Sequence, residues 1–321
     1  MSLLAPALLL GPGACSAPGK PAASGPSVWT AISLGSAQDA GIPHLACEGP
    51  HCREARARPR LEHRVAGLAL VAPGGRWWLV DATPDLPEQV HGRGRLPAGI
   101  LLTHAHIGHY TGLMYLGREG LDARGIPVHC SPAMAAFLET EAPWRQLVAL
   151  GNIELRPWGP DGRLDLAPGL GVEAWRVPHR DEFADTHAFA FRVEGGASLL
   201  YLPDIDAWEA WDRDLRRLVR DFDWLLLDGT FWSAAELPGR EIAEVPHPPV
   251  SATLELLAPL LGAPGSGRVV FTHFNHTNPL WDPDSAASRR LACAGAETTL
   301  SRRVFPLGPP PPGDGARPPR E

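Results

Sequence analysis

Apolar and polar residues alternate with two different periods along this chain, and each period predicts one kind of secondary-structure element. Residues 66–83 hold two runs of period-two apolar spacing on either side of a Pro-Gly-Gly turn, a pattern typical of two adjacent strands. Short apolar runs bounded by turn residues are typical of buried strands. Such runs occupy residues 28–37, 98–103, 126–131, 169–179, 187–195, 198–204, 223–230 and 268–274.

Longer stretches with helical spacing lie between these strands. Their apolar periodicity predicts helices over residues 108–120, 132–151, 207–222 and 251–262. Each half of the chain therefore consists of strands followed by helices, with hairpins first and crossovers later. This order favours an α/β fold in which two mixed β-sheets pack face to face and helices cover the outside.

Composition and charge narrow the class of partner. The chain has 321 residues, 44% of them apolar and 20% charged, which is ordinary for a globular protein with a full core. The net charge is −7, and no basic stretch stands out, so nucleic acid is not an expected partner. A small-molecule substrate fits this composition better.

The two ends lie outside the predicted domain at residues 27–306. Residues 1–26 begin with a short apolar run before Cys15, which resembles the signal and lipid-anchor motif of bacterial lipoproteins, and continue as a flexible tether. Residues 307–321 form a Pro-rich tail with little to bury. We expect an exported protein, periplasmic or held at a membrane only through Cys15. The alternative is a cytoplasmic protein with an Ala/Leu-rich N-terminus.

Three histidines stand close together in LLTHAHIGHYTGL, residues 101–113. His104 and His106 follow a predicted strand, where extended backbone turns both side chains to the same side, and His109 lies at a predicted helix start. Imidazole is a preferred ligand of Zn²⁺ and Fe²⁺. The cluster therefore predicts a metal site.

Two cysteines in one loop leave a choice open. Cys47 and Cys52 could pair in a disulfide if the protein is exported, or could hold a metal with His44 or His51. Their spacing alone is compatible with both.

The motif THAHIGHYTGL resembles the H-x-H-x-D-H motif of the metallo-β-lactamase superfamily. Further segments stand in the superfamily's order: VDATPD with Asp81, VPHRDEF with His179, LLYLPD with Asp204 and VVFTHF with His273. The similarity extends over residues 30–305. LGSAQDAGIPH and FTHFNHTNPLWD are most similar to the branch that contains coenzyme PQQ synthesis protein B, although CEGPHC has fewer cysteines than the zinc loop of that branch.

This resemblance implies the αββα sandwich of the superfamily and a metal centre. It assigns His104, His106 and His179 to one metal position, and His109, Asp204 and His273 to a second. Zn²⁺ is the implied metal, as one or two ions, with Fe or Mn as alternatives. Asp204 would act at the reacting centre between the metals, and Asp81 would orient a ligand histidine.

Gly108 departs from the pattern of the superfamily. It stands where related hydrolases carry a carboxylate that binds the second metal, so this chain offers no side chain there. The departure favours one strong metal over two, unless another carboxylate takes the place. Asp181, Asp185 and Asp206 are the alternatives in neighbouring predicted loops.

Several other polar residues are possible participants. His187 could act as an acid or base, Asp228 could support the site from a strand end, and His276 and Asn278 could donate hydrogen bonds to substrate. His247 reads as an ordinary loop residue.

The leading functional hypothesis is a metallo-hydrolase in which metal-bound hydroxide attacks an ester, amide or phosphodiester type of bond. The first alternative is a mononuclear iron-dependent oxidoreductase related to PQQ biosynthesis, which suits the loss of a carboxylate at Gly108. The second is a metal-binding lipoprotein without catalysis. The motifs select a metal and a fold, and the substrate stays open.

Overall fold

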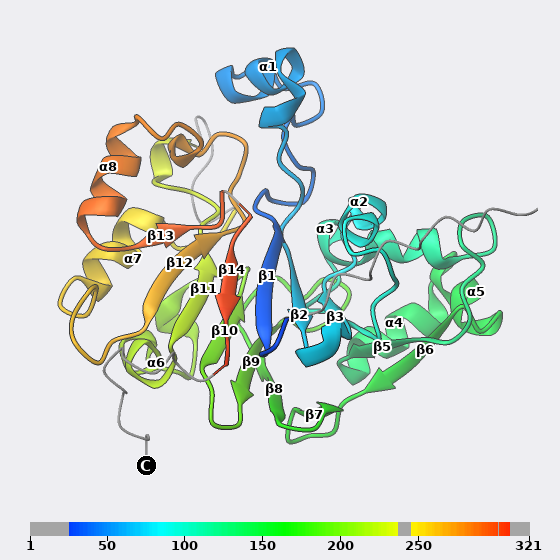
Figure 1. The fold of residues 1–321 in the computed structure, drawn as a ribbon. Coiled ribbons are helices and arrows are strands. Elements are labelled where there is room, and N and C mark those ends of the chain that lie inside the picture. The colour runs from blue at the N-terminus through cyan, green and yellow to red at the C-terminus, as the bar shows by residue number, and fades with distance from the viewer. Residues whose placement is uncertain (1–25, 237–244, 301, 309–321) are drawn as a thin grey trace, which may run out of the picture.

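Two mixed β-sheets form the centre of the protein. A computed structural model describes residues 26–236, 245–300 and 302–308. Within this part of the chain each sheet has seven strands, and the two sheets lie between two groups of helices (Figure 1). The predicted α/β sandwich is confirmed.

The first sheet is built from the N-terminal half and the last strand. Its order is β14 (Val304–Pro306), β1 (Thr30–Gly35), β2 (Gly67–Val71), β3 (Trp77–Val80), β4 (Ile100–Leu101), β5 (Ile126–Cys130) and β6 (Ile153–Pro157). The strands from β14 to β3 pair antiparallel, and those from β3 to β6 pair parallel. The β2–β3 pair turns through Pro-Gly-Gly as its period-two spacing predicts.

The second sheet comes from the C-terminal half. Its order is β13 (Glu297–Thr298), β12 (Arg268–Thr272), β11 (Trp224–Asp228), β10 (Ser198–Leu202), β9 (His187–Val193), β8 (Leu170–Arg176) and β7 (Arg163–Ala167). The strands from β10 to β13 are parallel, so their carboxyl ends meet at one edge.

Helices cover the outer faces of both sheets. In Figure 1, α6 (Leu215–Asp221), α7 (Val250–Leu257) and α8 (Ala286–Cys293) lie beside the second sheet, while α4 (Pro132–Thr140) and α5 (Trp144–Ala149) lie beside the first. Three further helices are α1 (Pro50–Ala57), α2 (Leu86–His91) and α3 (Ile107–Tyr110).

Strands of the second sheet are buried on both faces, which explains their continuous apolar runs. Phe189 and Phe191 belong to the core between the sheets, whereas Ala188 and Ala190, which alternate with them, belong to the core under helices α6, α7 and α8. Successive side chains of a strand point to opposite faces, so one strand serves both cores.

All four predicted helices are shorter than their apolar spacing suggests, and α7 ends at Leu257 instead of residue 262. The stretch 132–151 is two helices, because Pro143 cannot continue the helix that it follows. Within 207–222 only α6 is α-helical, and it starts where the Asp214 side chain accepts a hydrogen bond from the backbone N–H of Arg216. Within 108–120, α3 gives way to a 3₁₀ segment, Thr111–Leu116.

The folded part extends slightly beyond the predicted boundary at 306. Leu307 is fully buried, and its backbone N–H donates to the carbonyl of Trp29. The predicted signal and anchor with Cys15 and nearly all of the Pro-rich tail lie outside the described residues and stay predictions. Among the described residues, no helix combines the length and apolar character that crossing a membrane requires.

Candidate metal centre

The predicted ligands come together because they follow strand ends that face each other across the two sheets. Asp81 comes directly after β3, and His104 comes three residues after β4. Asp204 and His273 follow β10 and β12 of the other sheet. Loops at strand ends present side chains from a rigid support, so residues far apart in sequence converge there.

His104, His106 and His179 form the first group. The Nε2 atom of His179 lies 3.2 Å from Nδ1 of His106, and one ring nitrogen from each histidine lies within 4.8 Å of the others. Three neighbouring imidazole nitrogens are a suitable set of protein ligands for a Zn²⁺ or Fe²⁺ ion with an open coordination position.

His109 and His273 form the second group. Their Nε2 atoms are 3.2 Å apart, and both side chains are buried. The backbone of His273 is left-handed, with a φ of 63°, as is that of Asp81, with a φ of 66°. Such conformations cost energy in non-glycine residues and gather at functional sites.

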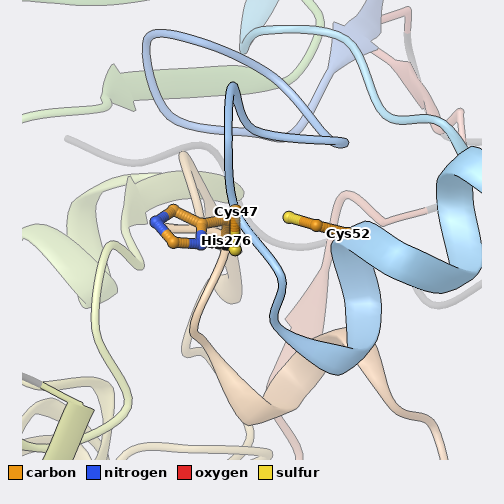
Figure 2. A group of neighbouring side chains, drawn as sticks. All are labelled: Cys47, Cys52 and His276. Carbon is orange, nitrogen blue, oxygen red and sulfur yellow. Dashed lines mark hydrogen bonds between the residues drawn. The ribbon is translucent and has the colours of Figure 1, made fainter.

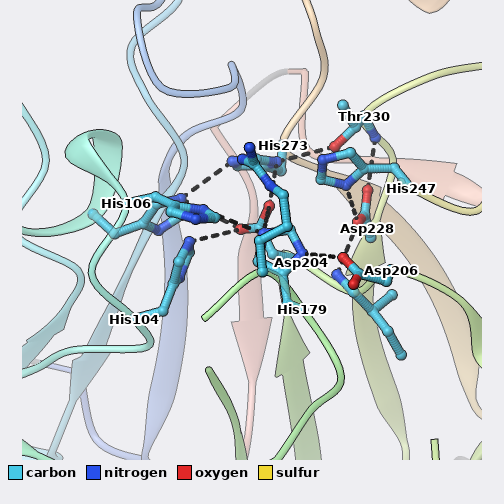
Figure 3. A network of polar contacts seen from close by, with 12 residues as sticks. His104, His106, His179, Asp204, Asp206, Asp228, Thr230, His247 and His273 are labelled. Atoms are coloured by element: carbon cyan, nitrogen blue, oxygen red, sulfur yellow. Dashed lines mark hydrogen bonds and ion pairs between the residues drawn. The ribbon is translucent and has the colours of Figure 1, made fainter. Parts of the chain in front are cut away.

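Asp204 lies between the two groups (Figure 3). One carboxylate oxygen, Oδ2, is 3.3 Å from Nε2 of His109 and 4.0 Å from Nε2 of His104. The other, Oδ1, is 3.8 Å from Nε2 of His179. A single carboxylate therefore faces both groups, as a ligand shared by two ions must.

Each of the five histidine rings is held by a neighbour through its other nitrogen. The partners of His104, His106, His109, His179 and His273 are respectively Thr103, Glu182, Asp81, Asp206 and Thr230. Metal-ligating histidines commonly have one nitrogen fixed in this way, which orients the ring and leaves the second nitrogen for the ion.

Three of the ligand rings are neutral, and two donor atoms of the centre lack another partner, which fits a metal. Burial lowers the pKa of His104 and His273 well below the usual value and that of His179 to about 2, so these rings are neutral ligands. Burial raises the pKa of Asp204 to about 7. Within the described part of the chain, Nε2 of His104 and Oδ2 of Asp204 are buried without a hydrogen-bond partner, a costly state that a cation relieves.

The family of the chain follows from its sequence as well as from this geometry. Residues 76–274 match the family described as the beta-lactamase superfamily domain. The chain belongs to the metallo-β-lactamase superfamily.

Two relatives place the chain within this superfamily. Coenzyme PQQ synthesis protein B of Methylococcus capsulatus is 30% identical over 302 residues, which cover 82% of this chain and 95% of that protein. The corresponding protein of a Methylobacterium species is 28% identical over 297 residues, 83% of this chain and 95% of that protein. The resemblance to this branch is confirmed.

The solved structures agree in fold. Zn²⁺-bound PqqB from Methylobacterium extorquens has a TM-score of 0.73 at 22% identity and covers 87% of this chain and 100% of its own. A diphosphatase from the PhnP family has a TM-score of 0.62 at 20% identity and covers 87% of this chain and 98% of its own.

Asp81 is the residue that positions His109 in this metallo-β-lactamase site. Its Oδ2 atom is 2.8 Å from Nδ1 of His109, and its Oδ1 accepts hydrogen bonds from the backbone N–H and the hydroxyl of Thr103. Burial acts to lower the pKa of His109, but the carboxylates of Asp81 and Asp204 raise it to about 9.

Replacing Asp81 should therefore loosen the metal without removing a ligand. We expect Asp81→Ala to weaken zinc binding about 10–100-fold, the usual effect of losing a partner behind a ligand histidine. Competition with a chromophoric chelator measures the affinity, and the exposed Asp161→Ala serves as control. Unchanged affinity in Asp81→Ala would contradict the positioning role.

His187 does not join the centre. Its ring packs against Trp158, with the ring centroids 5.0 Å apart, in a separate cavity of about 500 Å³ that also contains Arg176. The backbone N–H of His187 donates to the carbonyl of Thr103, the residue before His104. Among the described residues no hydrogen bond, ion pair or ring contact joins the His187 ring to the ligands, so the acid or base role suggested by the sequence stays a prediction.

His247 is the histidine that lies beside the ligands with a carboxylate partner. The sequence analysis did not identify it as a site residue. It is buried, its Nδ1 lies 2.7 Å from Oδ2 of Asp228, and its ring centroid is 5.4 Å from that of His179 (Figure 3). Asp228 also accepts from the backbone N–H of Ile205, next to Asp204. No short motif surrounds His247, so only its buried partner reveals it.

Asn278 serves the scaffold. Its amide donates 2.8 Å to the carbonyl of Gly229, and its side-chain oxygen accepts from the backbone N–H of Leu280. This buried position leaves it no contact with a substrate in the site.

A second candidate metal cluster lies where the N-terminal loop meets the loop after β12. Cys47 and Cys52 are free thiols, and the Sγ of Cys47 lies 3.2 Å from Nδ1 of His276 (Figure 2). One donor atom from each residue lies within 4.8 Å of the others. The imidazole thus comes from His276, rather than from His44 or His51 as the sequence suggested, because the loop after β12 folds onto the N-terminal loop.

Two cysteine sulfurs and an imidazole would supply three of the four ligands of a structural zinc. We expect Cys47→Ser with Cys52→Ser to lose one equivalent of zinc per chain while the histidine centre keeps its metal. Elemental analysis gives the count, and Co²⁺ substitution reports thiolate ligands by their charge-transfer absorption. The control is Cys293→Ser on the surface. Equal zinc in all three proteins would refute a metal at this cluster.

Proposed function

We propose that this protein is a metal-dependent hydrolase of an ester, amide or phosphodiester type of bond. The observation that supports this most is the arrangement of five oriented histidines in two groups around one carboxylate, Asp204. Two neighbouring metal positions suit hydrolysis, in which the attacking and the leaving oxygen both need charge stabilisation.

The residues divide the work between them. When bound, Zn²⁺ supplies Lewis acidity toward the oxygen atoms of the scissile group. The Asp204 carboxylate faces both groups of histidines and is the ligand that they share. Contacts of Asp81 with His109 and of Asp206 with His179 keep these two rings from turning.

His247 and Asp228 supply the proton for the leaving group. Asp228 accepts a hydrogen bond from Nδ1 of His247 at 2.7 Å, so the imidazolium form is stabilised and Nε2 is the nitrogen that can give up a proton. Burial tends to lower the pKa of His247, but Asp228 raises it above the usual value. A protonated imidazole beside His179 and Asp204 can therefore act as the general acid.

The test is metal-dependent turnover by the full chain. The protein is stripped with a chelator, reloaded separately with Zn²⁺, Mn²⁺ or Fe²⁺, and assayed with bis(p-nitrophenyl) phosphate, p-nitrophenyl esters and lactones. We expect hydrolysis that disappears on chelation and returns with metal. Hydrolysis that persists unchanged without metal, or bound metal without any turnover, contradicts the proposal.

A second candidate is an iron-dependent oxidoreductase with one ion at His104, His106 and His179. The observation that favours it is the similarity over most of the chain to proteins named for coenzyme PQQ synthesis. Oxygen consumption by the Fe²⁺-loaded protein in the same panel, with no hydrolysis by the Zn²⁺ form, would select this candidate. Bound metal with neither activity would leave a metal-binding protein without catalysis.

A further inference from the structure

Gly108 leaves the second group of ligands with two histidines and the shared Asp204. We propose that Asp39, from the loop after β1, supplies the carboxylate that the chain lacks at position 108 and completes the second metal position with His109 and His273. The inference rests on the proposed function only in requiring that the centre binds metal.

The Asp39 side chain is aimed at the second group. Its Oδ1 atom lies 3.8 Å from Nε2 of His109, and donor atoms of Asp39, His109 and His273 all lie within 4.8 Å of one another. Although the side chain as a whole is part-exposed, Oδ1 is buried and has no hydrogen-bond partner in the described residues. A buried carboxylate oxygen without a donor is costly, and a cation between it and the two imidazoles removes that cost.

Gly108 is what admits this carboxylate. A Cβ atom at position 108 would lie 2.2 Å from Oδ1 and 2.5 Å from Cα of Asp39, closer than atoms can approach. A side chain at 108 and Asp39 in its present place therefore exclude each other. The Asp39 carboxylate thus occupies the space in which a side chain at position 108 would begin. Its negative charge faces the second metal position from the loop after β1.

The loop is held against the segment that carries His273. The backbone N–H of Phe274 donates to the carbonyl of Ser36 at 2.7 Å, and the N–H of Gln38 donates back to the carbonyl of Phe274 at 2.9 Å. The side-chain amide of Asn275 donates to Oε1 of Gln38 at 2.8 Å. Asp39 itself is in the left-handed region, with a φ of 22°. These bonds fix Asp39 beside His273, and its unfavourable backbone is typical of a functional residue.

The three carboxylates that the sequence offered as replacements are occupied elsewhere. Asp181 pairs with Arg176, and Asp185 accepts from the hydroxyl of Ser131. Asp206 lies 2.7 Å from Nδ1 of His179, behind the first group. Asp39 is therefore the carboxylate that stands beside His109 and His273 without another bond at Oδ1.

The experiment counts metal and does not depend on turnover. The full chain, freed of metal, is titrated with Zn²⁺ by calorimetry, and with Co²⁺ so that thiolate-bound ions are recognised by absorption and paired ions by magnetic coupling. We expect two coupled ions at the histidine centre of the parent. Asp39→Asn should weaken the second about 100-fold or more, because losing a direct ligand costs no less than losing the partner of one, and should leave the first unchanged.

Two further variants make the result specific. Gly108→Ala adds only a methyl group but displaces Asp39, so it should lose the second ion as Asp39→Asn does. Asp181→Asn removes the same charge from a loop near His179 and should keep both ions. The first ion, bound with parental affinity, shows that each variant is folded.

The possible outcomes separate the two proposals. Retention of the second ion by Asp39→Asn, a parent that binds one ion, or equal loss in Asp181→Asn overturns the role of Asp39. Two coupled ions in a protein that hydrolyses nothing leave Asp39 as a ligand and overturn only the hydrolase.

Discussion

Asp204→Asn lowers kcat/KM of the zinc-loaded protein by about 10³-fold, since a metal centre contributes several kcal/mol of transition-state stabilisation and each 1.36 kcal/mol is tenfold. The asparagine keeps the shape of the side chain but removes the charge that faces both ligand groups. Oδ2 of Asp204 lies 3.3 Å from His109 and 4.0 Å from His104, so binding at both positions weakens together. Steady-state kinetics beside zinc titration measure the two effects.

The control for this prediction is Asp212→Asn, an aspartate whose side chain is 84% exposed. It should change neither zinc affinity nor rate. If Asp204→Asn weakens only one ion, the carboxylate belongs to one group and is not shared. If its rate equals that of the parent, Asp204 has no role in the reaction.

His247→Ala lowers kcat by about 10²–10⁴-fold for substrates with a basic leaving group, the range expected of a general acid. For p-nitrophenolate, which leaves without a proton, the effect is much smaller. Zinc affinity stays near that of the parent, because the five ligand histidines keep their own partners. The measurement compares kcat across a series of leaving groups of rising basicity.

Asp228→Asn tests the same pair from the other side. The amide still accepts from Nδ1 of His247 but no longer stabilises its positive charge, so the loss follows the same dependence on leaving group with a smaller size. The exposed His91→Ala is the control and should leave the series unchanged. An equal loss for all leaving groups in His247→Ala would assign this histidine to the architecture of the site instead of proton transfer.

Local sequence predicts part of this centre well. His104, His106 and His109 lie within six residues of each other and after a strand, so the chain has little freedom to separate them. Asp81, Asp204 and His273 each follow a short apolar run typical of a buried strand, and the parallel strands β10 and β12 bring Asp204 and His273 to one edge of the second sheet. The pattern predicts the sandwich for the same reason, since strands buried on both faces need two covering layers.

Predictions from local sequence were inaccurate where a single residue altered the structure that a longer apolar pattern predicts. The apolar spacing of 132–151 is continuous, but Pro143 divides it into α4 and α5. His187 resembles a site residue in its local sequence position, since it lies at the start of a strand and eight residues after His179. Its ring nevertheless packs against Trp158. Periodicity states which side of a strand a residue is on, and not which cavity lies on that side.

The sequence by itself thus predicted the fold from short-range periodicity, and its resemblance to the superfamily indicated the five histidines and Asp204, which stand near strand ends. The tertiary structure alone decided the residues that complete them: Asp39 beside His109, His247 on Asp228, and His276 beside Cys47. Two of these contacts join loops distant in the chain, 229 residues apart for Cys47 and His276, whereas His247 lies 19 residues after Asp228 at the end of β11. Their positions follow from the packing of one sheet on the other and the bonds between Ser36, Gln38 and Phe274, which no local pattern encodes.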